Sequence, residues 1–148
     1  MTVKTVLSVI VWGLLLYAAI SDLLWQQVYD LVWIVITGIQ FFLLLFYRCF
    51  TPDIVISLGF FIVIQEFVMD KAYGKADCHA LCCCALSYAS FRCGLNVYIF
   101  HLAVTFILLC VVQFSSGNVD KRLRLKKKIP MIPYILVGYW IVLCICVP

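Results

Sequence analysis

Long apolar blocks constrain this chain more than any other feature of its sequence. The first block runs from Val3 to Ile20 and contains a single charged residue, Lys4. A block of this length approaches the ~20 apolar residues that cross a bilayer core. Hydrophobic residues make up 66% of the 148 positions and charged residues 12%, against about 45–50% and about 25% in soluble domains. A soluble globule is excluded, because too few polar side chains exist to cover it.

Five further apolar blocks follow, and only short polar clusters separate them. They are Leu31–Tyr47, Ile54–Val68, Ala80–Phe91, Leu95–Phe114 and Ile129–Val147. No separator is long enough to form a second domain, so we predict one all-α, polytopic membrane helix bundle over residues 1–148. The first block reads as a retained span rather than a signal peptide, because more membrane sequence follows it at once.

The fourth block leaves the number of spans open. Its twelve residues would cover only ~18 Å as a helix, less than the ~30 Å hydrocarbon core. If the block recruits Asp77 to His79 and spans, the chain has six spans; if it is re-entrant, the chain has five. The basic run from Lys121 to Lys128 belongs in the cytoplasm in both cases. Both topologies also place the loops that hold Asp22 and Asp77 on the same membrane face.

Nine cysteines invite a disulfide or zinc interpretation, but most lie inside apolar blocks, where cysteine behaves as a small hydrophobe. Cys82, Cys83 and Cys84 are consecutive, so on a helix they point three ways and cannot converge on one metal ion. The sequence contains no C-x-x-C pair with a matching second pair, which a zinc ribbon requires. We expect no metal and no cofactor. The basic run lacks interleaved aromatic residues, so we expect it to meet anionic membrane lipid and not nucleic acid.

Two aspartates lie at the edges of apolar blocks: Asp22 directly follows the first, and Asp77 directly precedes the fourth. A carboxylate at membrane depth is costly and by default marks a functional site, although either residue can simply end its helix at the interface. Two carboxylates brought together by packing the first helix on the fourth can share one proton. The ionised member can then deprotonate water while the protonated member donates to a peptide carbonyl, which is the chemistry of aspartic peptidases.

Three segments carry a resemblance to a known family. Ser21 to Asp30 reads S-D-L-L-W-Q-Q-V-Y-D and is similar to a D-L-x-x-x-x-I-P-N motif. Gly74 to Leu81 reads G-K-A-D-C-H-A-L and is similar to G-x-G-D-x-K-L. Lys128 to Gly138 reads K-I-P-M-I-P-Y-I-L-V-G and is similar to I-P-F-x-P-x-L-x-x-G. In this order, and over nearly the whole chain, the sequence resembles the type IV prepilin peptidases and archaeal preflagellin peptidases.

The resemblance implies a six-helix membrane peptidase in a prokaryotic cytoplasmic membrane, with its amino terminus outside and its active site at the cytoplasmic face. Asp22 and Asp77 take the positions of the catalytic pair. The supporting or substrate-binding positions implied by the motifs are Gly74, Ala76, His79, Pro130 and Pro133, with Ala76 and His79 replacing the family's Gly and Lys. The implied substrate is a prepilin-like protein with a short basic leader and an apolar helix. The loop from Ser21 to Asp30 is too short for the cytosolic insert of long members, so we do not predict their methylation activity.

Two other function classes stay open from the residues alone. One is a small channel or transporter subunit in which Asp22 and Asp77 bind a cation or relay protons. The other is a catalytically silent homologue that acts as an assembly factor. Glu66 either ends the third helix or lines a groove or proton path, and His101 is expected to hydrogen-bond across the bundle. Asp30 and Asp70 are alternates for the two aspartates. The sequence does not give the oligomeric state.

Overall fold

The computed structural model describes residues 3–47, 49, 51–69, 74–116 and 129–146, and all regular structure within them is helical. The bounds of the seven segments are α1 (Val3–Trp25), α2 (Asp30–Phe46), α3 (Pro52–Val63), η1 (Ile64–Met69), α5 (Lys75–Ser90), α6 (Leu95–Ser115) and α7 (Ile132–Cys146). The π-helix η1 directly continues α3. The predicted all-α fold class is confirmed for these residues. The basic run from Lys121 to Lys128, and Asp70, lie outside them.

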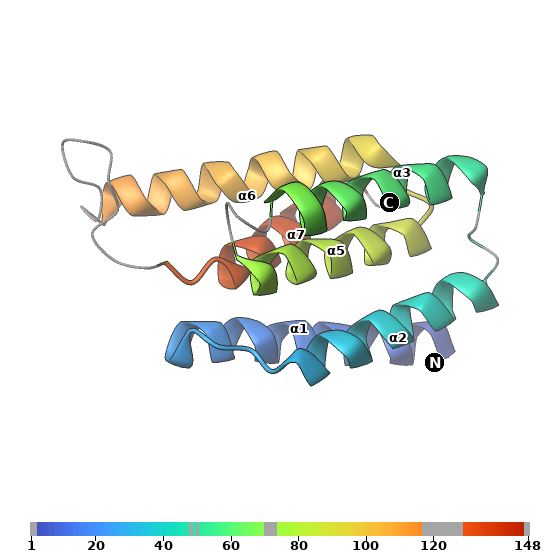
Figure 1. The fold of residues 1–148 in the computed structure, drawn as a ribbon, viewed down its shortest axis with the longest axis horizontal. Helices are drawn as coiled ribbons and strands as arrows, with labels where there is room; N and C mark the ends of the chain where they lie inside the picture. Colours follow the sequence, from blue (N-terminus) through green and yellow to red (C-terminus); the bar gives the residue numbers. More distant parts are fainter. Residues whose placement is uncertain (1–2, 48, 50, 70–73, 117–128, 147–148) are drawn as a thin grey trace.

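The helices run roughly along the long axis of the molecule and alternate in direction (Figure 1). α5 and α7 form a middle layer, with α1 and α2 on one side and α3 and α6 on the other. α1 ends and α5 and α7 begin at the left side of Figure 1, which we call the Asp22 end of the bundle. Segments far apart in sequence therefore meet there, and the sequence expectation that Asp22 and Asp77 share one face is met.

α5 is the most enclosed helix, although it is the least apolar of the described helices. Twelve of its sixteen residues are buried, and most of these are Ala, Cys or Ser. Small side chains let helix backbones approach closely, which drives helix association where no hydrophobic effect acts between helices. The run of cysteines from Cys82 to Cys84 is buried in this packing. Its composition therefore explains how α5 contacts α2, α3, η1, α6 and α7.

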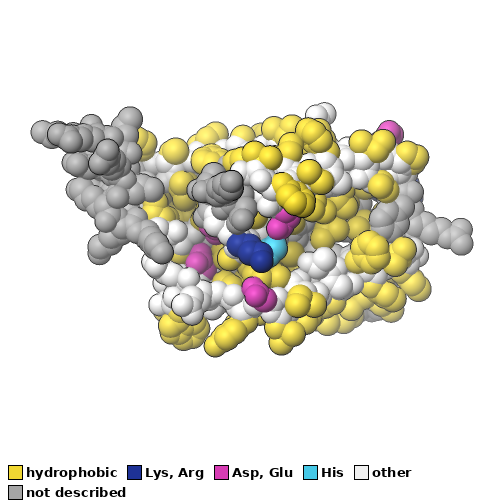
Figure 2. Space-filling model, in the orientation of Figure 1, with side chains coloured by type: hydrophobic (Ala, Val, Ile, Leu, Met, Phe, Trp, Pro, Cys, Tyr) yellow, Lys and Arg dark blue, Asp and Glu magenta, His cyan; other side chains and the backbone are white. Residues whose placement is uncertain are grey.

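The outer surface of the bundle is apolar (Figure 2). Large exposed side chains such as Leu24, Ile56 and Ile107 are more than half accessible. Three helical stretches are long and apolar enough to cross a membrane, namely Thr5–Trp25, Pro52–Met69 and Leu95–Ser115. α2 and α7 are shorter apolar helices. Length and composition thus support a membrane-associated helix bundle.

Hydrogen bonds between helices hold the middle layer to its neighbours. Gln40 Nε2 on α2 donates to the carbonyl of Cys83 on α5 at 2.8 Å and also to the Ser87 hydroxyl. His101 Nε2 on α6 meets the carbonyl of Ile135 on α7 at 2.9 Å. This contact confirms the expectation that His101 bonds across the bundle. Such bonds between helices stabilise a bundle in an apolar environment by about 0.6–2 kcal/mol each.

The helices extend beyond the apolar blocks at their polar ends, which corrects the placement of Asp22 and of Glu66 and agrees with the alternative in which the fourth helix recruits Asp77 to His79. α1 continues to Trp25, so Asp22 lies inside its last turns and does not follow it. α5 begins at Lys75, so Asp77 lies in its first turn. Glu66 does not end the third helix, since η1 runs on to Met69. Hydropathy marks the apolar part of a helix, whereas backbone hydrogen bonds continue until the chain turns.

Candidate active site

The start of α5 depends on glycine at one position. Gly74, the residue before the helix, has φ of +111° and ψ of 149°, a conformation that side chains resist. Its carbonyl accepts a hydrogen bond from Cys78 N–H at 3.2 Å, which closes the first turn. Ala76 is an ordinary helical residue packed against the core. The backbone thus requires glycine at the first position of the predicted motif and accepts alanine at the third.

Asp22 is fixed by the way α1 ends. The helix stops at Gln26, whose φ of +52° turns the chain away, and Ser21 Oγ donates to the carbonyl of Gln27 at 2.6 Å. The Asp22 side chain is only 9% exposed. Its Oδ2 accepts a hydrogen bond from the backbone N–H of Ile132 at 3.2 Å. The carboxylate therefore faces the amino-terminal end of α7, where the helix dipole favours negative charge.

Pro130 and Pro133 flank the residue that donates to Asp22. Pro130 lies in the non-helical segment before α7, and Pro133 is the second residue of the helix. Proline is well tolerated in a first helical turn because its missing N–H has no partner to lose there. The backbone N–H of Ile132, between them, is directed to Asp22. The double-proline segment thus contributes a backbone donor to the candidate site, and its prolines shape the chain around that donor.

Asp22 and Asp77 lie at the same end of the bundle, near enough for the charge of one carboxylate to disfavour ionisation of the other. We expected α1 and α5 to pack directly against each other. They do not pack extensively; instead, each of them packs against α2 and α7. Gly74 belongs to the same group, since a Cβ at its position would lie 3.6 Å from Asp77 Oδ2. The structure therefore brings together Asp22, Asp77, Gly74 and the start of α7.

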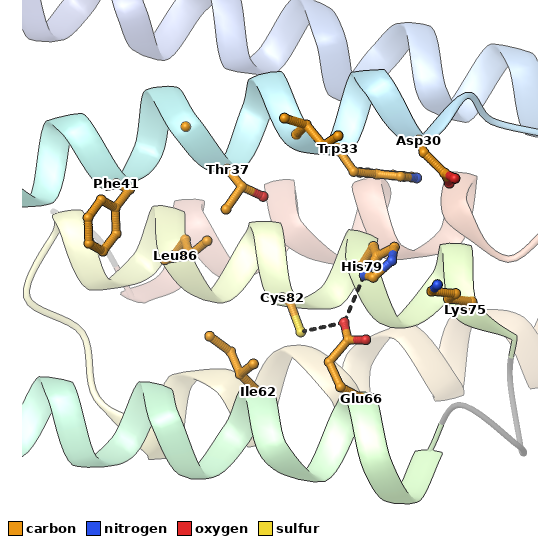
Figure 3. Close-up of a pocket in the computed structure, with 12 residues that line it drawn as sticks. Asp30, Trp33, Thr37, Phe41, Ile62, Glu66, Lys75, His79, Cys82 and Leu86 are labelled. Carbon is orange, nitrogen blue, oxygen red and sulfur yellow. Dashed lines mark hydrogen bonds and ion pairs between the residues drawn. The ribbon is translucent and has the colours of Figure 1, made fainter.

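His79 lies on a different side of α5 from this group. Its Nδ1 is 2.7 Å from Oε1 of Glu66 on η1, and the Cys82 thiol is 3.9 Å from the same oxygen (Figure 3). Residues two apart on a helix do not share a face. Within the described residues, no hydrogen bond or ion pair joins His79 to Asp22 or Asp77. Its position in the motif is thus explained here by pairing with Glu66.

Two features of the site escaped sequence reasoning. The Ile132 N–H is a backbone atom, so no residue type could identify it, although the neighbouring prolines flagged the segment. The second feature is the pairing of Glu66 with His79, which the sequence could have indicated. Two ionisable residues near a membrane segment, Glu66 and His79, each need a partner, and pairing them satisfies both.

A cavity of about 530 Å³ lies beside the end of α1. Its lining comes from Tyr17, Ser21, Trp25, Gln27, Val28 and Tyr29. Five of these six residues belong to the segment Ser21 to Asp30, which carries the first part of the family resemblance. The cavity borders Ser21, the residue next to Asp22, but neither Asp22 nor Asp77 is among the residues that line it.

Two neighbouring carboxylates that shared one proton would provide both a base and an acid for the activation of water. Among the described residues, no group of three His, Cys, Asp or Glu side chains is arranged to hold a metal ion. Comparisons of the chain with protein-family models, curated proteins and solved structures found no match.

Proposed function

We propose that this chain is a membrane aspartic endopeptidase that cleaves the leader peptide of prepilin-like proteins at the cytoplasmic face of a prokaryotic membrane. One observation carries the proposal. The three segments with the family resemblance, which are separated by more than forty residues along the sequence, converge on the Asp22 end. They contribute Asp22, then Gly74 and Asp77, and finally the Ile132 N–H.

The proposed topology has six spans, with α1, α2, α3–η1, α5, α6 and α7 each crossing once. The alternating helix directions in Figure 1 support it, and so does the course of α5 along the bundle as a separate helix. α5 has sixteen residues and covers about 24 Å. Because its neighbours bury most of it, the surrounding bilayer meets little of its short length, and modest mismatch is accommodated by tilt or local thinning.

The contacts suggest different roles for the two aspartates. The Ile132 N–H bonds to Asp22, and a hydrogen bond to the charged form of a carboxyl favours that form. We therefore assign the negative charge to Asp22 and the shared proton to Asp77. Asp22 takes a proton from water while the oxygen attacks the scissile carbonyl carbon, and Asp77 donates its proton to the carbonyl oxygen. Collapse of the tetrahedral intermediate breaks the C–N bond and sends a proton to the leaving amine.

Buried polar side chains weigh against the channel or transporter alternative. Such a protein would be expected to line a path across the membrane with polar groups. Here Gln40 and His101 instead bond to backbone carbonyls of neighbouring helices. Gln113 Nε2 donates to the Tyr134 hydroxyl at 3.3 Å, again joining two helices. These groups form hydrogen bonds between neighbouring helices.

The test is cleavage of a co-expressed reporter that has a short basic leader, a small residue and an apolar helix. We expect the wild-type chain to shorten the reporter, and Asp22→Asn or Asp77→Asn to lower the cleavage rate by at least about a thousandfold. Asparagine at 22 can still accept the Ile132 hydrogen bond, so the bundle should assemble. Asp53→Asn is the matched control, because Asp53 is exposed in the first turn of α3, at the other end.

Membrane levels of each variant are compared first, so that a folding defect is recognised. Cleavage by Asp22→Asn or Asp77→Asn near the wild-type rate would disprove the catalytic assignment. A wild-type chain that leaves every such reporter intact, while remaining folded, would favour the assembly-factor alternative instead.

A further inference from the structure

A second and larger cavity lies on the other side of α5 from the aspartate pair. It has a volume of about 740 Å³ and is walled by α2, α5 and the α3–η1 segment. Figure 3 shows that its polar residues Asp30, Lys75, His79 and Glu66 gather at one end, where α2 and α5 begin. Apolar residues line the rest. We call this cavity the α2–α5 groove.

The length of the groove matches one membrane leaflet. Asp30 is the first residue of α2, and Phe41, at the apolar end, is eleven residues further on. Eleven helical residues rise about 16 Å, and half of a ~30 Å hydrocarbon core is about 15 Å. Ile34 and Phe41 are also exposed on the outside of the bundle, so the groove opens to the side.

The charges at the polar end argue against a transmembrane helix as the occupant. Such a helix is apolar along its length and would offer no charged partner to Asp30 and Lys75, which line the groove. The groove holds about 740 Å³. The space instead suits extended hydrocarbon chains, for which Ile62 and Leu86 provide apolar walls.

The polar end carries charges of both signs. Glu66 and His79 satisfy each other at 2.7 Å. Asp30 and Lys75 also line the groove, and neither forms an ion pair within the part of the chain that the structure describes. A carboxylate and an ammonium group at one end complement a ligand that carries one positive and one negative charge.

Trp33 supplies an independent sign of a ligand. Its side chain is 4% exposed and lines the groove, yet its ring Nε1–H has no hydrogen-bond acceptor within the described structure. Buried donors without an acceptor are rare and costly. Figure 3 shows the ring extending toward Asp30, with its nitrogen at the polar end of the groove. The nitrogen itself has almost no accessible surface, so a ligand oxygen at this end would give the donor its acceptor after a small rotation of the ring into the groove.

We propose that the α2–α5 groove is a binding site for a phosphoethanolamine lipid. Its primary ammonium group donates to Asp30, and its phosphate accepts from Lys75 and from the Trp33 ring N–H. Its hydrocarbon chain runs past Ile34 and Leu86 toward Phe41. The lipid thus fills the side of α5 that lies away from the aspartate pair, and its binding does not depend on peptidase activity.

The test is native mass spectrometry of the full-length protein, extracted from bilayers with equal amounts of phosphatidylethanolamine, phosphatidylcholine and phosphatidylglycerol. We expect retained phosphatidylethanolamine to exceed each of the other lipids by about tenfold, because phosphatidylcholine has no N–H and phosphatidylglycerol has no cation. Asp30→Asn, Lys75→Gln and Trp33→Phe should each reduce this preference, and Trp140→Phe, on the exposed face of α7, should not.

A pair of glycine variants tests the groove itself. Gly38 lines the groove and Gly59 does not, and a Cβ at either position meets nothing within 4 Å. Gly38→Leu should fill the groove and lower lipid retention by more than about tenfold, whereas Gly59→Leu should leave it unchanged. Both variants should remain folded, since both side chains enter open space.

Three outcomes would overturn the proposal. The first is equal retention of all three lipids, which would mean that no headgroup is recognised. The second is unchanged retention in Gly38→Leu. The third is displacement of the lipid from the groove beside Gly38 by a competitor that binds there in its place. The competitors are soluble phosphoethanolamine and a peptide with a basic leader and an apolar helix. The first of these two competitors would indicate a phosphate site, and the second a substrate site.

Discussion

The two sides of the first turns of α5 handle charge in opposite ways. On one side Asp77 lies near enough to Asp22 for their like charges to interact. On the other side His79 faces Glu66, and an acceptor and a donor meet at 2.7 Å. Stability alone favours the second arrangement and penalises the first. An unfavourable local arrangement within an otherwise consistent fold is expected at functional sites, which is why we place the chemistry at Asp77 and not at His79.

The largest expected effect concerns the aspartates as a unit. The double variant Asp22→Asn/Asp77→Asn should cleave the reporter no more slowly than either single variant, because each aspartate serves one half of a single proton exchange. The measurement is the initial cleavage rate in membranes with matched protein levels. If the loss of rate in the double variant equals the product of the losses in the two single variants, the two aspartates act independently, which would contradict a shared site.

Packing of α7 should show the next largest effect. A Cβ at Gly138 would lie 2.7 Å from Thr105 Oγ1 and 3.3 Å from the His101 ring, so Gly138→Ala must push α6 and α7 apart. We expect a loss of about 1–3 kcal/mol in the free energy of unfolding, together with reduced cleavage because α7 carries Ile132. Gly13→Ala on α1 is the control, since its Cβ meets nothing within 4 Å. Equal stability of the two variants in denaturant titrations would contradict this packing.

Gly74→Ala should act locally on the Asp77 side. Alanine resists the φ of +111° at this position, at a cost of about 1–3 kcal/mol if the chain keeps its path. The start of α5 would shift to relieve part of this strain, and Asp77 would move with it. We therefore expect a smaller loss of stability than in Gly138→Ala and a clear fall in cleavage. Ala76→Gly, one residue inside the helix, should leave the cleavage rate close to that of the wild type.

The smallest effect is expected on the His79 side. Glu66→Gln and His79→Gln remove the ion pair, whose two side chains are about a quarter exposed, at 28% and 27%. Partly exposed pairs contribute up to about 1 kcal/mol, so both variants should stay folded and cleave the reporter at most of the wild-type rate. A loss of cleavage in His79→Gln as large as that in Asp77→Asn would erase the contrast between the two sides of α5.

Much of the fold could be predicted because apolar blocks in this chain correspond to helices. The block Leu95–Phe114 and the helix α6 differ by a single residue. The fourth block was too short by itself, since it missed the polar first turn from Lys75 to His79. The π-helical end of the third helix left no signal in the hydropathy. Patterns of residue type locate lipid-facing and buried segments, whereas helix ends depend on backbone conformation at single residues such as Gly74.

The candidate site was predictable only where side chains carry it. Asp22 and Asp77 were identified because carboxylates beside membrane segments are costly. The direct packing of their helices was not observed, because sequence does not reveal that α2 and α7 connect α1 to α5. The backbone donor of Ile132 and the unpartnered ring nitrogen of Trp33 depend on tertiary placement. Neither has a signature in the order of residues.

The most direct test of the account is whether Asp22 and Asp77 share one proton. Infrared spectroscopy of protein labelled with isotopic aspartate can detect a protonated aspartate carboxyl at neutral pH in the wild-type chain. We predict one such signal, absent in Asp77→Asn, weakened in Asp22→Asn because the neighbouring charge is removed, and unchanged in Asp53→Asn. A wild-type protein with every aspartate ionised, or the same signal in all four proteins, would contradict a shared proton between Asp22 and Asp77.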